Sequence, residues 1–161
     1  MFITQAEADK LIEMPKKAVD ANQYEFPLYG ESLSMPLVSL DRREHFLVDV
    51  NRKGSVRLAR CTYQERYIDV IILVRLEIDG PPHTNPDVSE VPLAYLEPYN
   101  GLTISCPHLH LYVEEYMDRW AVPAPGEYFA KIGDLYDTLY DFFRYCNIIE
   151  PPVLPKRLFI Q

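Results

Sequence analysis

The chain has 161 residues, a length that fits a single domain with a sizeable hydrophobic core. Its composition, 48% hydrophobic and 25% charged, is ordinary for a globular protein, and it contains no apolar run of the roughly 18 residues that a membrane span needs. The net charge of −8 argues against strong non-specific binding to a nucleic-acid backbone, which usually depends on a basic patch.

The cysteines and the N-terminal residues indicate the cellular compartment of the protein. The three cysteines are odd in number, widely spaced and form no Cys-x-x-Cys pair. This argues against a disulfide scaffold or a zinc ribbon and is typical of a reducing environment. The N-terminal residues lack the basic and apolar regions of a secretory signal. We therefore expect a cytoplasmic protein that does not cross a membrane.

The first expected element is a helix over residues 4–18. Thr4 and Glu7 have the spacing of a capping box, in which each side chain bonds to the other residue's backbone. An apolar stripe that includes Leu11 supports the helix. Pro15 should disturb the final turn, because proline has no backbone N–H and crowds the preceding carbonyl.

Strand patterns then dominate residues 32–79. Ser32–Ser39 alternates polar and apolar residues, and Pro36 within it predicts an edge strand. His45–Asn51 has the same alternation, and a turn after it predicts a hairpin partner at Ser55–Tyr63. These patterns indicate an antiparallel sheet.

The clearest predicted strand is Arg66–Asp79. Every second residue from Ile68 to Ile78 is apolar, and because side chains alternate in a strand, this set predicts a core face. The opposite face ends in three charged residues, Arg75, Glu77 and Asp79.

Residues 80–103 are rich in Pro, Asn and Gly and predict a long excursion, with a hairpin insert around Val91–Leu96. Long excursions of this kind are often functional. The chain is expected to return as a strand at Ser105–Val113. One face of this strand is apolar, and the other carries His108, His110 and Tyr112.

A C-terminal helix is expected over residues 134–146, with Asp134 as its cap and an apolar stripe facing the core. The tail, 150–161, contains several prolines and should be extended. The whole chain, 1–161, is therefore predicted to be one α+β domain, a single antiparallel β-sheet packed with N-terminal and C-terminal helices.

The histidines indicate where a site lies. Three of the four are His83, in a proline-rich turn, and His108 and His110, on the last strand. Histidine titrates near neutral pH and is the commonest metal ligand. If the two strands that end near Arg75 and His110 are neighbours, burial of their apolar faces on one side places the polar side chains together on the other.

One hypothesis is acid–base chemistry on a phosphodiester. In it, His108 and His110 exchange protons, Arg75 binds the phosphate, and His83 orients them or shares the proton transfer. The candidates for substrate binding are Asn85 and Tyr112.

A second hypothesis is a divalent metal such as zinc, because imidazole and carboxylate ligands suit it. Gly101-x6-His108-x-His110-x3-Glu114 resembles the first motif of the cupins, although its glycine spacing is longer by one residue and the second cupin motif is absent. This resemblance implies a site for one divalent metal, and the alternative is a protein without a cofactor. The candidate ligands are His83, His108, His110, Asp79 and Glu114.

A broader resemblance combines Arg75-x-Glu77-x-Asp79-Gly-Pro-Pro-His83-x-Asn85-Pro with Pro107-His108-x-His110-x-Tyr112. This combination resembles a small family of uncharacterised bacterial proteins and, more distantly, toxin proteins of the TumE type. The resemblance implies a bacterial cytosolic protein of a toxin–antitoxin or defence locus, with nuclease-like activity. Its partners would be RNA and a cognate antitoxin protein.

Structural interpretations of the same residues remain open. A His-x-His segment on a strand is often solvated or structural, Arg75 with Glu77 and Asp79 is often a surface ion-pair ladder, and the turn around His83 can be merely rigid. A third hypothesis is a non-catalytic interaction module, because the chain has twelve tyrosines and tyrosine is enriched at interfaces.

Overall fold

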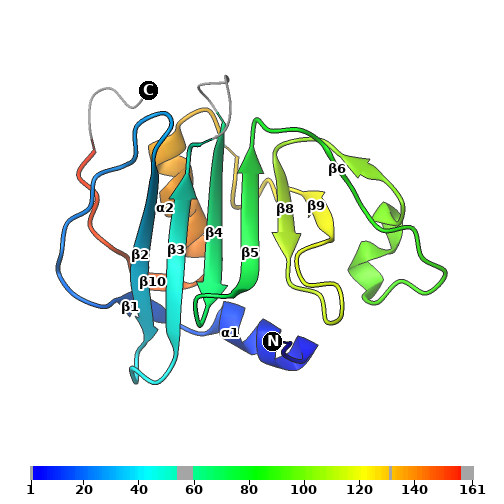
Figure 1. The fold of residues 1–161 in the computed structure, drawn as a ribbon, viewed down its shortest axis with the longest axis horizontal. Helices are drawn as coiled ribbons and strands as arrows, with labels where there is room; N and C mark the ends of the chain where they lie inside the picture. The colour runs from blue at the N-terminus through cyan, green and yellow to red at the C-terminus, as the bar shows by residue number, and fades with distance from the viewer. Residues whose placement is uncertain (1, 54–59, 131, 157–161) are drawn as a thin grey trace.

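The computed structural model describes residues 2–53, 60–130 and 132–156 (Figure 1). Its helices are α1 (Gln5–Glu13), the short 3-10 helix η1 (Ala94–Tyr99) and α2 (Leu135–Tyr145). Its strands are β1 (Lys16–Ala18), β2 (Ser32–Ser39), β3 (His45–Asn51), β4 (Cys61–Tyr67), β5 (Ile71–Ile78), β6 (His83–Thr84), β7 (Thr103–Ile104), β8 (His108–Leu111), β9 (Ala121–Pro123) and β10 (Ile148–Glu150).

Eight of these strands form one sheet, in the order β10-β1-β2-β3-β4-β5-β8-β9, and β6 pairs with β7 in a second, two-stranded sheet. The α+β class is therefore confirmed. The prediction of a single antiparallel sheet is corrected, because β1 and β10 pair in parallel and β6 and β7 lie outside the main sheet. The parallel pair joins opposite ends of the chain, a contact between segments too distant for a local sequence pattern to indicate.

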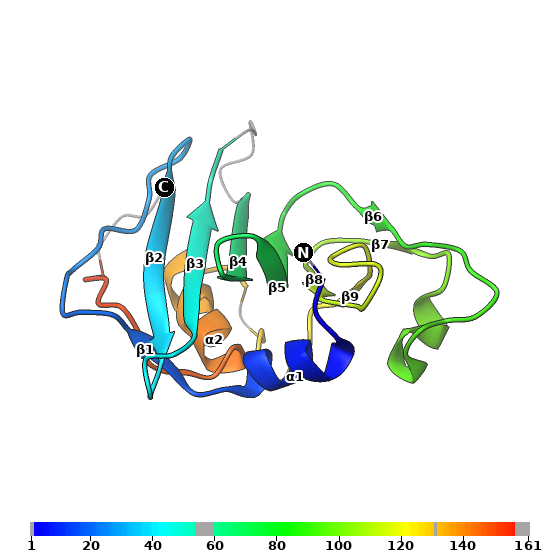
Figure 2. The same cartoon turned by 60° about the horizontal axis from the view of Figure 1, so that its bottom comes forward.

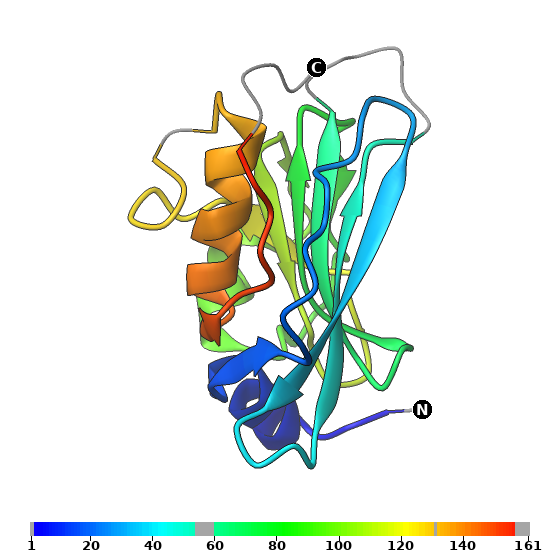
Figure 3. The same cartoon turned by 90° about the vertical axis from the view of Figure 1, so that its left-hand side faces the viewer.

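The helices define which face of the sheet is buried. Figure 3 shows α2 against one face of the sheet, and the rings of Phe142 in α2 and Tyr63 in β4 lie 5.9 Å apart there. Figure 2 shows α1 along one end of the strands. Since side chains alternate, residues next to Tyr63, such as Gln64, lie on the face opposite α2. This opposite face carries the candidate site.

The N-terminal helix begins as predicted and ends earlier. The capping box is confirmed: Thr4 N–H donates to Glu7 Oε2 over 2.8 Å, and Glu7 N–H donates to Thr4 Oγ1 over 3.2 Å. The predicted helix over 4–18 is corrected, because it stops at Glu13 and residues 16–18 form β1. Met14 has a ψ of 130°, the extended conformation that a residue before proline prefers.

The predicted strand Arg66–Asp79 is in fact a hairpin. β4 ends at Tyr67 and β5 begins at Ile71, with Ile68 and Asp69 at positive φ in the turn between them. The predicted core residues of this turn are exposed, Val70 to 65%. Apolar residues alternate through the turn as they do in the strands, so this pattern did not predict that the chain reverses direction there. The strand predicted at Ser55–Tyr63 lies partly outside the described residues, at 55–59. Of its remainder, Thr62 and Tyr63 pair with β3 as expected.

A β-bulge corrects the alternation inside β5. Glu65 pairs with Val74 and Arg66 with Ile72, so Leu73 is an extra residue in β5. Both Leu73 and Val74 are therefore buried in the core. From Val74 onward the alternation is the predicted one, and this places Arg75 and Glu77 on the open face.

The excursion at residues 80–103 extends beyond the β8–β9 edge of the sheet (Figure 1). The predicted hairpin at Val91–Leu96 is corrected, because η1 occupies part of this segment. Leu96 of η1 packs with Val113 and Trp120 in a small second core. Hydrophobic burial thus holds the excursion against the main sheet.

The C-terminal helix is confirmed within one residue at each end, and Asp134 caps it by accepting from Asp137 N–H. Residues 151–156 contain no helix, and 157–161 lie outside the described residues. None of the helices in the described ranges combines the length and apolar character that crossing a membrane requires.

Candidate functional site

The histidine cluster, His83, His108 and His110, is assembled from two segments. In the pairing of β5 with β8, Arg75 lies opposite His110 and Glu77 lies opposite His108. The two strands are therefore neighbours, and directly opposed residues share a face. β6 adds His83, whose ring centroid lies 4.7 Å from that of His110 and 6.1 Å from that of His108. The rings of His108 and His110 lie 5.0 Å apart.

Backbone carbonyls orient two of the rings. His110 Nδ1 lies 2.8 Å from the carbonyl oxygen of Asp118, and His83 Nε2 lies 2.7 Å from that of Arg119. Because a carbonyl oxygen can only accept, each of these nitrogens must carry a proton. The other nitrogen of each neutral ring, Nε2 of His110 and Nδ1 of His83, is then the one with a lone pair.

Burial controls the charge of the cluster. His108 and His110 are 2% and 1% exposed, whereas His83 is half-buried. Burial lowers the pKa of His110 to about 3, and the positive charge of Arg75 adds to this effect. Burial also lowers the pKa of His108, against the opposing influence of Glu77. Both rings are therefore neutral at neutral pH.

Arg75 is held by two carboxylates. It forms ion pairs with Asp118 and with Glu77, whose Oε1 lies 3.2 Å from Arg75 Nε. Thr62 Oγ1 donates to the second oxygen of Glu77 over 2.9 Å. Asp118 is not among the residues predicted for the site, because it lies in a loop without any periodic pattern. Asp118 supplies both a carboxylate for Arg75 and a carbonyl for His110.

Cys106 adjoins the cluster as well. Its Sγ lies 3.6 Å from His108 Nδ1, and burial raises the pKa of its thiol. The thiol is therefore protonated at neutral pH, which makes it a poor nucleophile.

The cluster stands at one end of two polar rows that cross the open face of the sheet. In each row, successive residues lie directly opposite one another on neighbouring strands. At the other end of the rows, a hollow of about 220 Å³ lies over β2, β3 and β4. The rows are Ser34, Asp49, Gln64, Arg75 and His110, and Ser32, Asn51, Thr62, Glu77 and His108.

Asn85 lies beside the cluster, but its amide is engaged by the backbone. The side chain is 3% exposed. Its Nδ2 donates to the carbonyls of Ala121 and Tyr99 over 2.8 and 3.1 Å, and its Oδ1 accepts from Ala121 N–H over 2.7 Å. These bonds attach the excursion to β9.

Tyr112 does not share the histidine face, which corrects its predicted position. Its backbone N–H donates to the carbonyl of Leu73, the extra residue of the bulge, and its side chain packs in the main core. Its hydroxyl donates to the carbonyl of Ile3 over 2.9 Å. The bulge explains the change, because it places a core residue opposite Tyr112.

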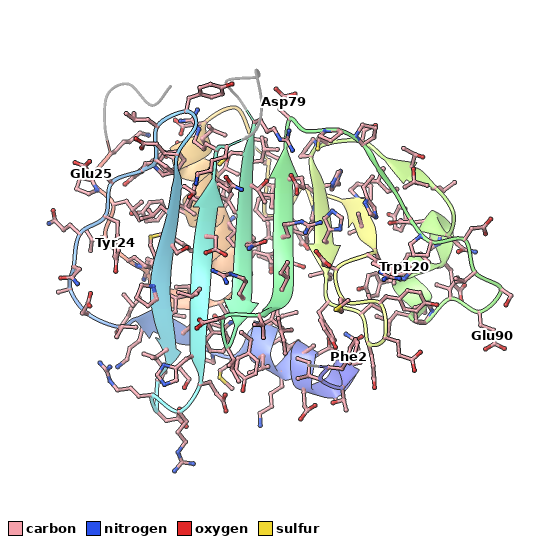
Figure 4. The ribbon with its side chains drawn as sticks, in the orientation of Figure 1. Phe2, Tyr24, Glu25, Asp79, Glu90 and Trp120 are labelled. Atoms are coloured by element: carbon pink, nitrogen blue, oxygen red, sulfur yellow. The ribbon has the colours of Figure 1, made fainter. Side chains whose placement is uncertain are left out.

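The acidic candidates for a metal site lie at different places. Strand β8 ends at Leu111, and Glu114 beyond it accepts from Gln5 N–H at the start of α1. Asp79 follows the end of β5 at a φ of 49° (Figure 4). Within the described part of the chain, no three His, Cys, Asp or Glu side chains form a group that could hold a metal ion.

The sequence model of a family of unknown function, DUF6978, matches residues 3–148. The chain belongs to this family. The match takes in the histidine cluster and both α-helices, and it confirms the expected membership of a family without an assigned function. The resemblance to TumE toxins stays a prediction. Comparison with curated proteins and with solved structures gave no match.

Proposed function

We propose that the histidine cluster is a metal-free proton-transfer site that cleaves RNA. The observation that carries the proposal is the convergence of three imidazoles, 4.7 to 6.1 Å apart, beside the guanidinium of Arg75. Imidazoles supply a general base and a general acid, and a guanidinium stabilises the charge that develops on phosphate.

The burial of the rings suggests their roles. His108, neutral at neutral pH, takes the proton of a ribose 2′-hydroxyl, whose oxygen then attacks phosphorus. His83, the half-buried ring, donates a proton to the leaving 5′-oxygen. His110, with a pKa of about 3, cannot act as a cationic acid at neutral pH, so it positions the other two rings. Arg75 must exchange a carboxylate partner for the phosphate.

The biological setting follows from the resemblance described above. We place the protein in the bacterial cytoplasm, as a toxin-like member of a toxin–antitoxin or defence locus with RNA as substrate and an antitoxin as partner. The net charge of −8 leads us to expect weak RNA binding.

The test measures cleavage of RNA by the purified protein in the presence of chelator. Loss of the general base or acid should lower the rate about 100-fold or more, in His108→Ala and in His83→Ala. The matched control is His45→Ala, because His45 is exposed at the start of β3. Circular dichroism verifies that each variant is folded.

Equal cleavage by the wild type and both variants would contradict the proposal. Stoichiometric zinc in the wild type that is absent from His110→Ala would replace it by the metal-binding hypothesis. Stoichiometric manganese in the wild type that is absent from His110→Ala would also favour the metal-binding hypothesis.

A further inference from the structure

Two adjoining hollows lie at the end of the sheet where α1 begins. The larger, of about 330 Å³, is lined by Phe2, Ile3, Thr4, Glu7, Glu114 and Glu115. The smaller, of about 120 Å³, is lined by Val70, Ile71, Ile72, Tyr112, Met117 and Asp118. The Tyr112 hydroxyl bonds both the N–H and the carbonyl of Ile3, so the linings of the two hollows are in contact. We call them together the N-terminal surface.

The N-terminal surface exposes large apolar side chains. Phe2 is 67% exposed, Val70 is 65% exposed and Met117 is 39% exposed. Phe2 lies beside the loop that follows β8 (Figure 4). Single exposed apolar residues are common, but several around one concavity mark an interaction site.

The charge around these apolar groups is negative. The lining contains four carboxylates, those of Glu7, Glu114, Glu115 and Asp118, and no basic side chain. Because Asp118 pairs with Arg75, the net negative charge comes from the three glutamates. Two of them are fixed by the backbone at the start of α1, where Glu7 accepts from Thr4 N–H and Glu114 from Gln5 N–H. Hydrogen bonds from Thr4 lower the pKa of Glu7, so this carboxylate stays charged at neutral pH.

We propose that the N-terminal surface binds a basic amphipathic segment of a partner protein. Its apolar side chains would enter the hollows beside Phe2 and Met117, and its lysines or arginines would lie against the acidic rim. Charge complementarity selects this occupant over an acidic or neutral one. The proposal does not depend on catalysis by the histidine cluster.

The test uses two synthetic helical peptides with leucine at positions i, i+3, i+4 and i+7. One carries lysine at the remaining positions and the other glutamate. We expect the lysine peptide to bind the full chain, measured by fluorescence anisotropy at low salt, and the glutamate peptide to bind at least about tenfold more weakly.

Substitutions locate the binding site. Phe2→Ser and Glu115→Lys should each weaken binding of the lysine peptide about tenfold, because both side chains are exposed and line the larger hollow. The matched controls are Leu102→Ser and Glu90→Lys, at exposed residues of the excursion. Unchanged melting temperatures verify that the variants fold.

Three outcomes would overturn the proposal. They are equal binding of the two peptides, equal weakening by the controls, and self-association of the wild type that Phe2→Ser abolishes. The last would assign the surface to a second copy of this chain. None of the three bears on RNA cleavage, so the two proposals fail separately.

Discussion

At Asn85 one side-chain amide performs the hydrogen bonding of a strand partner. It accepts from the N–H of Ala121 and donates to its carbonyl, and it reaches Tyr99 as well. The residue was predicted to bind substrate, yet all these bonds are internal, and the two to Ala121 are buried. Its contacts indicate that the excursion which carries His83 depends on it.

We therefore expect Asn85→Ala to lower the free energy of unfolding by about 2–4 kcal/mol, because buried backbone groups lose their partners. Urea denaturation measures the change. Thr84→Ala is the control, since Thr84 is exposed and its hydroxyl bonds the exposed hydroxyl of Thr103. A loss in Asn85→Ala no larger than that of the control would contradict this role.

Helix α1 shows how much of a helix a local sequence pattern specifies. The spacing of Thr4 and Glu7 predicted the capping box, which the structure contains. The end of the helix depended on Pro15 and on the pairing of the next residues, Lys16–Ala18, with β2 and β10. A propensity for helix is weak compared with such tertiary pairing.

Replacement of the cap tests this account. Thr4→Ala should destabilise the protein by about 1 kcal/mol, because the N–H of Glu7 loses its acceptor. Thr4→Ser should retain most of the stability. Thermal melting of the three proteins measures the order, and equal stability of Thr4→Ala and the wild type would refute the contribution of the cap.

The hairpin of β4 and β5 was wrongly predicted as one continuous strand. Its turn carries apolar residues, so the alternation passes through it without interruption. Arg66 donates to the carbonyl of Asp69 across the turn over 2.6 Å, and β4 pairs with β5 along its length. The turn contains no glycine or proline, and the pairing of the two strands fixes its position.

A buried ion pair connects segments from three parts of the chain. Lys16 and Glu65 are both 0% exposed, and Lys16 Nζ lies 3.1 Å from Glu65 Oε1. The ammonium also donates to the carbonyls of Ile12 and Cys146, over 2.9 and 2.7 Å. Burial raises the pKa of Glu65 to about 7, against the attraction of Lys16.

This pair makes stability depend on pH. Because the folded protein holds the proton of Glu65 more tightly than the unfolded chain, the contribution of Glu65 is complete below its usual pKa of 4.5 and is lost as pH rises through about 7. The histidines act in the opposite direction: the lowered pKa of His110 costs stability as pH falls below 6.5.

The comparison of Glu65→Gln with the wild type isolates the effect of Glu65 on the pH dependence of stability. The free energy of unfolding of the wild type, minus that of the variant, should fall by about 3 kcal/mol between pH 4.5 and pH 8. Urea denaturation at a series of pH values measures the difference. A difference that stays constant with pH would show that Glu65 does not titrate in this range.

Local patterns in the sequence predict the α+β class, the caps at Thr4 and Asp134, and the common face of Arg75, Glu77, His108 and His110. These properties follow from periodicity and from contacts a few residues apart. Four other features come from long-range contacts in the fold: the reversal at Ile68 and Asp69, the bulge at Leu73 that moves Tyr112 into the core, the parallel pairing of β1 with β10 and the pairing of Arg75 with Asp118. Each of these depends on hydrogen bonds or ion pairs between segments whose relative positions the fold sets, and no local pattern encodes such positions.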